Sequence, residues 1–298
     1  MKANFPVAYM TAILTNESGD VEKISEIVSE CKRMGIAVLP PDINVSEGGF
    51  TITMNQDTDE EEIRFGLYTI KNLGSDIADA IISERNNSGP YTSFENFIER
   101  ITHKNLNKKS LEALTMCGAL DQFAERGQVL ANMDAILEFH KKNVKDNASQ
   151  GSLFESSHAS FTMKKSSPAT GEQKLVWEKE LLGLFVSGFP LDPWKEKIES
   201  RNLSISRIQH DLDDGKGVSL AVIIEKIRIT MTKKGDKMAL ITLRDYTSNI
   251  EVAVFPESYK RYKDLLILDI PLVVTGKIST RNGDKTMIID VIKKLEKL

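Results

Sequence analysis

The sequence is poor in the residues that build disulfides and metal centres. It has two cysteines and four histidines among 298 residues. Cys31 and Cys117 lie in helical patterns beside apolar residues, which predicts buried thiols in a reducing compartment rather than a disulfide. The histidines are scattered without the spacing of zinc ligands. We therefore expect no metal and no other cofactor in this chain.

Long apolar runs are absent as well. No run approaches the ~18 residues that cross a bilayer. The first residues, MKANFPVAYMTAIL, lack the continuous apolar core and the cleavage site of a signal peptide. We expect a cytoplasmic location and no membrane partner. The length predicts about two to three globular domains.

The chain also lacks the overall positive charge of many nucleic-acid-binding proteins, because its formal net charge is −4. The charge is unevenly distributed. Residues 214–298 contain 16 Lys and Arg against 11 Asp and Glu, a net charge of +5. Residues 1–213 contain 23 against 32, a net charge of −9. The C-terminal part therefore offers a modest local attraction for polyanions.

Residues 63–85, IRFGLYTIKNLGSDIADAIISER, predict a helix, a tight hairpin and a second helix. This spacing is typical of a helix-hairpin-helix, in which the first free N–H groups of the second helix face a backbone phosphate. Asn72 stands at a position where glycine is usual and tolerates positive φ better than most residues. The candidate ligands of duplex DNA here are Asn72, Leu73, Gly74 and Ser75.

Two details of this stretch stay open. Either Ser75 or Asp76 can cap the second helix. An ordinary helical hairpin with a glycine stop accounts for the same residues.

A second hairpin is predicted by NKKSLEALTMCGALDQF, and residues 61–142 are interpreted as one tandem helix-hairpin-helix domain. Lys108 and Lys109 at the start of this unit, and Gly118 in its turn, are further candidates for contacts with duplex DNA. The alternative for the lysines is a solvated helix end. A longer helix from Glu125 is expected to close the domain.

Residues 143–176 are rich in Ser, Asn, Lys and Gly and predict a flexible linker. One apolar island, Gln150 to Phe154, lies inside it. Gln, two small residues and Leu-Phe match the pentapeptide with which bacterial replication proteins dock on the sliding clamp. Leu153 and Phe154 would fill an apolar pocket, while the Gln150 amide would bond the rim. The alternative is that both apolar side chains fold back on their own domain.

Residues 214–298 predict the strand and helix order β-β-β-α-β-β, which is that of a five-stranded OB-fold barrel. The turns are expected at Gly235 and at Asn282-Gly283. Phe255 lies in an apolar run and is interpreted as core rather than as a base-stacking residue. Basic side chains near the strand 2–3 face are candidates for single-stranded DNA: Lys226, Arg228, Lys233, Lys234, Lys237 and Arg244.

The remaining segments are helical. Residues 1–60 predict a helix between Asp20 and Gly35, followed by a strand and a turn. The acidic run 56–62 is interpreted as a solvated loop before a helix N-terminus rather than as a metal site. Residues 177–213 are interpreted as a helical connector.

The order of these parts resembles the C-terminal portion of the alpha subunit of bacterial DNA polymerase III. KANFPVAYMTAILT and CKRMGIAVLPPDIN resemble the end of that family's fingers, which residues 1–60 would represent. IRFGLYTIKNLG and NKKSLEALTMCGALD resemble its hairpin region, and MTKKGDKMALITLRDYTSNIEVAVFP resembles its OB domain. EKELLGLFVSGFPLD resembles its signature EKE-x-LG-x-Y-x-SGHPLD, with Phe185 in place of Tyr and Phe189 in place of His.

The resemblance implies a multidomain α+β fold and a DNA polymerase as the parent enzyme. Phosphoryl transfer in that family needs palm carboxylates that hold two Mg²⁺ ions. Those residues lie upstream of what would align here, so no catalytic residue is predicted and the chain is not expected to polymerise alone. It is expected to be an isolated fragment or a split gene product.

The implied partners are duplex and single-stranded DNA, the sliding clamp, the remaining part of the alpha subunit and other replisome subunits. Two other functions stay open. The chain could be part of a split polymerase that is active only with a separate palm-bearing chain. The OB barrel could instead serve mainly for protein contacts.

Overall fold

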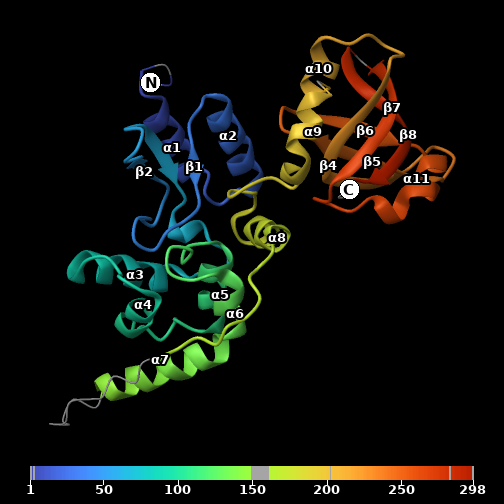
Figure 1. Ribbon diagram of the computed structural model, residues 1–298. Helices are drawn as coiled ribbons and strands as arrows, with labels where there is room; N and C mark the ends of the chain where they lie inside the picture. The colour runs from blue at the N-terminus through green and yellow to red at the C-terminus, as the bar shows by residue number, and fades with distance from the viewer. Residues whose placement is uncertain (1, 3, 149–160, 202, 282, 297–298) are drawn as a thin grey trace. The chain divides into compact units, whose positions relative to one another are not determined.

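The computed structural model describes residues 2, 4–148, 161–201, 203–281 and 283–296. They form two compact units, Met1–Gly188 and Phe189–Leu298, each with a hydrophobic core of its own (Figure 1). The boundary between the units falls inside the predicted connector 177–213. The α+β fold class, with a helical first part and a barrel at the end, is confirmed.

The first unit begins with two helices beside a small sheet. The sheet has the strand order β1-β3-β2, in which β3 runs parallel to β1 and antiparallel to β2. Gly35 follows α2 at a φ of +76°, so the predicted end of that helix is confirmed. These elements are α1 (Pro6–Asn16), α2 (Val21–Arg33), β1 (Val38–Leu39), β2 (Thr51–Met54) and β3 (Glu61–Arg64).

β3 corrects the interpretation of the acidic run 56–62, which we expected to lead into a helix. Glu61 and Glu62 pair with Met54 and Thr53 in the sheet, and Ile63 is fully buried there. Each residue of Glu61–Arg64 is paired with a residue of β2, so this segment is a strand of the sheet rather than a loop before a helix. The predicted boundary at residue 60 therefore divides a sheet.

The hairpin region follows directly. The first of its expected helices is reduced to one 3-10 turn, because β3 takes the residues before it. The elements are η1 (Leu67–Thr69), α3 (Ser75–Ser88), α4 (Phe94–Arg100), α5 (Lys108–Met116) and α6 (Arg126–Ala131).

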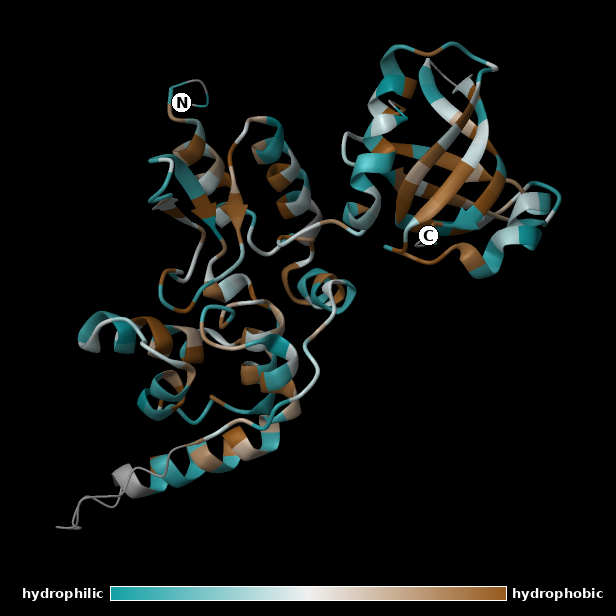
Figure 2. Cartoon of the chain, viewed as in Figure 1, coloured by the Kyte–Doolittle hydropathy of each residue, from teal (hydrophilic) through white to brown (hydrophobic). Residues whose placement is uncertain are grey.

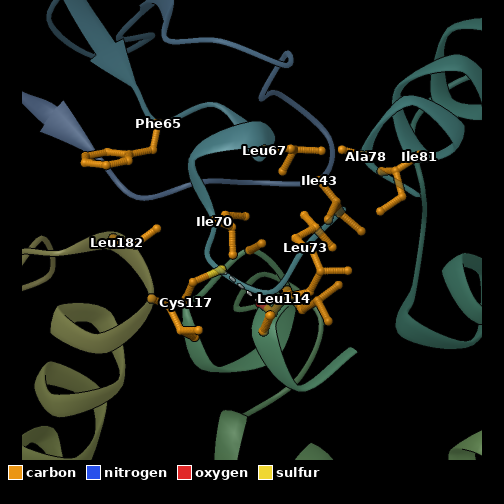
Figure 3. Close-up of a cluster of buried hydrophobic side chains, with 14 of the residues drawn as sticks. Ile43, Phe65, Leu67, Ile70, Leu73, Ala78, Ile81, Leu114, Cys117 and Leu182 are labelled. Carbon is orange, nitrogen blue, oxygen red and sulfur yellow. Dashed lines mark hydrogen bonds between the residues drawn. The ribbon is translucent and has the colours of Figure 1, made fainter. Parts of the chain in front are cut away.

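Side chains from both hairpins meet in one core. Figure 3 shows Ile70 and Leu73 of the first hairpin beside Leu114 and Cys117 of the second, with Leu182 nearby. All five are at most 7% exposed. Both cysteines of the chain are buried and free, as the sequence predicted. The first unit is thus held by a shared core rather than by separate modules.

The predicted linker 143–176 differs from the structure at both ends. α7 (Met133–Ala148) continues past its start, and α8 (Gly171–Leu182) begins before its end. Residues 161–170, which we call the strap, have no regular secondary structure but are bound to the helices. The ring of Phe161 stacks on Phe139 of α7 with 5.3 Å between centroids.

Asn132 holds the strap and also interrupts the long helix expected from Glu125. Its side-chain amide donates to the carbonyl of Lys164 at 2.9 Å, and its side-chain oxygen accepts from the N–H of Lys164 at 2.9 Å. Asn132 is therefore the residue between α6 and α7.

The second unit is a barrel with the predicted order β-β-β-α-β-β, so the OB fold is confirmed. Its five strands have the order β6-β5-β4-β7-β8, and the Thr286 hydroxyl of β8 donates to the Glu251 carbonyl of β6 at 2.7 Å, which joins the two outer strands. Figure 2 shows hydrophobic residues along the barrel strands. The elements are η2 (Asp192–Trp194), α9 (Lys195–Ser200), α10 (Ile205–His210), β4 (Gly217–Met231), β5 (Lys237–Arg244), β6 (Asn249–Val254), α11 (Pro256–Tyr262), η3 (Lys263–Leu265), β7 (Leu272–Arg281) and β8 (Asp284–Lys294).

Candidate nucleic-acid interface

The first hairpin places its loop at the surface. Asn72 has a φ of +72°, as expected for a residue in a position that favours glycine. Gly74 is the N-cap of α3, with φ −71° and ψ 152°, and no side chain caps the helix. Neither Ser75 nor Asp76 is therefore the cap. Both are exposed residues of the first turn.

The N–H groups at this site differ in what they can bind. The N–H of Leu73 donates to the carbonyl of Ile70 at 3.1 Å, so it is already used within the turn. The first N–H groups of α3, beginning at Ser75, have no partner inside the helix. A Cβ built on Gly74 meets no atom within 4 Å. Gly74 thus leaves open space in front of the helix N-terminus, while the side chain of Leu73 is buried in the core.

The second hairpin has a different construction. Gly118 is buried at a φ of +89°, and a Cβ built there would lie 2.4 Å from the Arg126 guanidinium. Packing against Arg126 accounts for this glycine without any contact to DNA. The N-cap of α6, Glu125, accepts from the N–H of Gln128 at 3.0 Å and from the N–H of Ala169 in the strap at 2.9 Å. A carboxylate of the protein thus occupies the place that a phosphate would need.

The two lysines of the second hairpin lie at the start of α5. Lys108 and Lys109 are both exposed. The Lys108 ammonium is 3.3 Å from a carboxylate oxygen of Asp134, an ion pair in which both side chains are more than half exposed. Ser110 and Asn107 form a capping box at this helix end. Its N–H groups are therefore partly satisfied by the chain itself.

The barrel has a hollow of about 930 Å³ on its outer face, which we call the groove. Its lining comes from α10, β5, β6, the end of β7, the β7–β8 turn and β8. Residues that line it include Leu240, Asn249, Phe255, Lys285, Thr286 and Ile288.

Phe255 corrects an expectation. We interpreted it as core, but its ring is 48% exposed and lines the groove. Val252 and Val254 are buried, so strand alternation places Phe255 on the outer face. Ile288, also in the groove, is 44% exposed. An exposed aromatic and an exposed aliphatic side chain in one hollow suit the flat face of a base.

The basic candidates of the barrel divide into two groups. Lys226 and Arg228 are exposed on β4 and pair with Thr242 and Leu240, so they share the face of the groove. Lys233, Lys234 and Lys237 are exposed around the β4–β5 turn, where Gly235 has the expected positive φ of +84°.

Arg244 is already engaged within its own unit. Its Nη1 donates to Glu225 at 2.6 Å, and its guanidinium lies 6.0 Å from the ring centroid of Phe189. Phe189, one of the two departures from the family signature, packs on Tyr246 with 5.1 Å between ring centroids. Burial, followed by the bond from its hydroxyl to Asp192, raises the pKa of Tyr246.

Three other predictions concern features outside these surfaces. Gln150, Leu153 and Phe154 lie outside the described residues. Among the residues that are described, no group of three or more His, Cys, Asp and Glu side chains is arranged to hold a metal. Over the same residues, no helix has the length and apolar character to cross a membrane.

Comparisons with known proteins agree with this geometry. Residues 35–129 match the family model of the helix-hairpin-helix motif, and residues 218–295 match that of an OB-fold nucleic acid binding domain.

Proteins named DNA polymerase III subunit alpha are similar over the whole chain. The protein of Borreliella burgdorferi is 35% identical, over 100% of this chain and 26% of its own length. The protein of Deinococcus radiodurans is 33% identical, over 100% of this chain and 23% of its own length. The protein of Bacillus subtilis is 31% identical, over 99% of this chain and 26% of its own length. The chain therefore spans about a quarter of the length of these relatives.

Proposed function

Since the chain is homologous over its whole length to a C-terminal part of DNA polymerase III subunit alpha, we propose that it holds DNA in the cytoplasm during replication. The observation that carries the proposal is that a helix-hairpin-helix region and an OB domain occur together in this one chain. The hairpin would hold duplex DNA by its backbone, and the barrel would hold single-stranded template.

The duplex would bind at the first hairpin rather than at both. The N-terminus of α3 has no side-chain cap and faces open space at Gly74. The N-terminus of α6 is occupied by Glu125 and covered by Ala169 of the strap. A phosphate needs N–H groups that are not already bonded. The second hairpin would then serve to pack the first one in place.

Gly74→Ser tests the duplex site. Serine is a favourable N-cap residue, so the variant should be as stable as the parent chain. Its hydroxyl would bond the helix N–H groups and its side chain would stand where the phosphate approaches. We expect a loss of about tenfold in affinity for a short duplex, measured by fluorescence anisotropy at several salt concentrations. Unchanged affinity in a folded variant would refute the hairpin role.

The single strand would bind in the groove, with a base stacked on Phe255 and phosphates near Lys226 and Arg228. Base stacking on an aromatic side chain contributes about 1–3 kcal/mol. Phe255→Ala should therefore weaken binding of oligo-dT by about fivefold or more. Phe5→Ala, a change of an exposed aromatic residue in the first unit, is the matched control. If the barrel serves mainly for protein contacts, Phe255→Ala will leave oligo-dT binding unchanged.

Clamp docking is a separate part of the proposal and depends on the sequence Gln150 to Phe154. A Leu-Phe pair within a polar stretch of sequence supplies the apolar anchor that such a peptide needs. The double variant Leu153→Ala/Phe154→Ala should abolish capture by the sliding clamp, while Ser156→Ala/Ser157→Ala should not. Equal capture of both variants would refute the docking motif.

Polymerisation would need a palm and its two Mg²⁺ ions, supplied by residues other than these 298, on the same chain or on another. We propose that the present chain contributes DNA binding to such an assembly and no catalytic residue. Primer extension should be absent with this chain alone. Extension by a palm-bearing chain should become more processive when the present chain is added. Extension by this chain alone, after purification to homogeneity, would contradict the assignment.

A further inference from the structure

A second hollow in the OB unit lies between the β4–β5 turn and α11. It has a volume of about 520 Å³. Figure 1 shows α11 at one end of the barrel, and Figure 2 shows that this helix is mostly hydrophilic. We call this hollow the basic cleft. It is lined by Gly235, Asp236, Lys237, Tyr259, Lys260 and Lys263.

The basic cleft has more positive than negative side chains in its lining. Lys237, Lys260 and Lys263 are exposed, and none of them forms an ion pair within the part of the chain that the structure describes. Asp236 is the one carboxylate of the lining. Three ammonium groups around one hollow attract an anion with several charges more strongly than separate surface lysines do.

The fold fixes two of these lysines relative to the third. Tyr259 packs against the barrel core and so anchors α11. Its N–H donates to the carbonyl of Phe255 at 2.7 Å. Lys260 and Lys263 are three residues apart and lie side by side on the helical surface. Lys237, at the start of β5, lines the same hollow.

The cleft also has an apolar edge. Met231 is paired with Lys237 across the two strands, so their side chains share one face. Met231 is 65% exposed, and Ile229, two residues before it, is 59% exposed. A single strand presents phosphates together with unpaired bases and sugars, whereas a duplex presents its bases only in grooves. Cations beside exposed apolar side chains therefore fit a single strand.

One helical turn connects the groove to the basic cleft, because the N–H of Tyr259, which lines the cleft, donates to the carbonyl of Phe255, which lines the groove. Phe255 lines the groove, and α11 begins at the next residue, Pro256. Within eight residues the chain passes from the groove to Lys263 of the cleft. The carboxylates of residues 255–264 and of the cleft lining are Glu257, Asp264 and Asp236.

We propose that the basic cleft binds the phosphates of a single strand where that strand leaves the groove. Lys237, Lys260 and Lys263 are the ligands. The proposal extends the path of the strand around the end of the barrel, and it rests on the single-strand function proposed for the groove.

The test uses the full chain and fluorescent oligo-dT of two lengths, one that fills the groove alone and one that reaches the cleft. An OB fold covers about 4–16 nucleotides, so lengths of about 6 and about 20 are suitable. The variant is Lys260→Ala/Lys263→Ala. Its control is Lys293→Ala/Lys294→Ala, two exposed lysines at the end of β8. Thermal unfolding verifies that both variants are folded.

We expect the cleft variant to bind the long oligomer several-fold more weakly than the parent chain and the short oligomer equally well. The slope of log K against log salt should fall by about 1.4 for the long oligomer, because each lost phosphate contact contributes about 0.7 for a single strand. In the control variant the slope should fall by less than half of that amount.

Two results would overturn the proposal, and they are distinguishable. If Phe255→Ala weakens binding of both oligomers while the cleft variant binds as the parent does, the basic cleft is refuted and the groove stands. If the parent chain binds neither oligomer, the single-strand function itself is refuted, and the cleft with it.

Discussion

The guanidinium of Arg126 and the carboxylate of Glu178 form an ion pair at 3.1 Å in which the side chains are only 2% and 0% exposed. The second oxygen of Glu178 accepts the N–H groups of Val186 and Ser187, at 3.0 and 2.9 Å. Arg126 also donates to the carbonyl of Met116 at 2.9 Å. One buried pair thus joins α6, the end of α5, α8 and the turn that follows it.

Removal of one partner should be costly. Glu178→Leu leaves the buried Arg126 charge with the Asp121 carboxylate and the Met116 carbonyl as acceptors, and it leaves two backbone N–H groups without one. We expect the free energy of unfolding to fall by about 3–5 kcal/mol, measured by urea denaturation. Lys108→Ala, which removes an exposed ion pair, should change it by less than about 1 kcal/mol. Similar losses in the two variants would contradict the role of burial.

Gly118→Ala should destabilise the chain more than Gly89→Ala does. Both glycines have positive φ, +89° and +81°, so both substitutions carry backbone strain. A Cβ at Gly89 meets no atom within 4 Å, whereas at Gly118 it would collide with Arg126. We expect the free energy of unfolding to fall by about 1 kcal/mol for Gly89→Ala and by at least about 1 kcal/mol more for Gly118→Ala. Thermal unfolding of the two proteins side by side measures the difference, and equal midpoints would argue against the contact.

The two cysteines should make the chain sensitive to alkali. Burial raises the pKa of Cys31 to about 11 and that of Cys117 to about 12. An unfolded thiol has a pKa of about 8.5, so the folded state holds the proton more tightly. The contribution of the buried, protonated thiols to the free energy of unfolding is therefore complete below pH ~8.5. It is lost as the pH rises towards the pKa values of the folded state.

Iodoacetamide should accordingly alkylate neither thiol of the native chain at pH 8 and both in denaturant. Cys117→Ala should unfold with a flatter pH dependence between about pH 8.5 and 11. Rapid alkylation of Cys117 in the native chain would show that the thiol is accessible.

Asn132→Ala should release the strap. The variant removes both bonds to the Lys164 backbone while leaving Phe161 stacked on Phe139. We expect hydrogen exchange at residues 162–169 to become about tenfold faster, in proportion to a local free-energy loss of about 1.4 kcal/mol. Lys141→Ala, an exposed change on α7, is the control. Exchange that stays at the parent rate would mean that the strap is held elsewhere.

Local patterns predicted most of the elements. The cap at Asp20, the stop at Gly35 and the turn at Gly235 depend on neighbouring residues alone, and each is present. At Phe255 two sequence patterns indicate different locations for the side chain. It ends an apolar run, which favoured the core, but the alternation from Val252 and Val254 places it outside. The alternation of side chains along the strand therefore predicts the location of Phe255, and the apolar run does not.

Other features could not be derived from neighbours in the sequence. Asn132 bonds Lys164 across 32 residues, and Arg126 pairs with Glu178 across 52. The strap has the composition of a linker because the groups that bind it belong to other elements. For the same reason Gly118 resembled a hairpin glycine, although Arg126 explains it.

The contact between Phe139 and Phe161 joins the two segments of chain that flank residues 149–160. Both side chains pack against the same core. The cost of closing a loop grows only with the logarithm of its length, about 0.6 kcal/mol for each doubling. Insertions between residues 149 and 160 should therefore be tolerated. A single protease cut there should leave two fragments that copurify and, after separation, recombine.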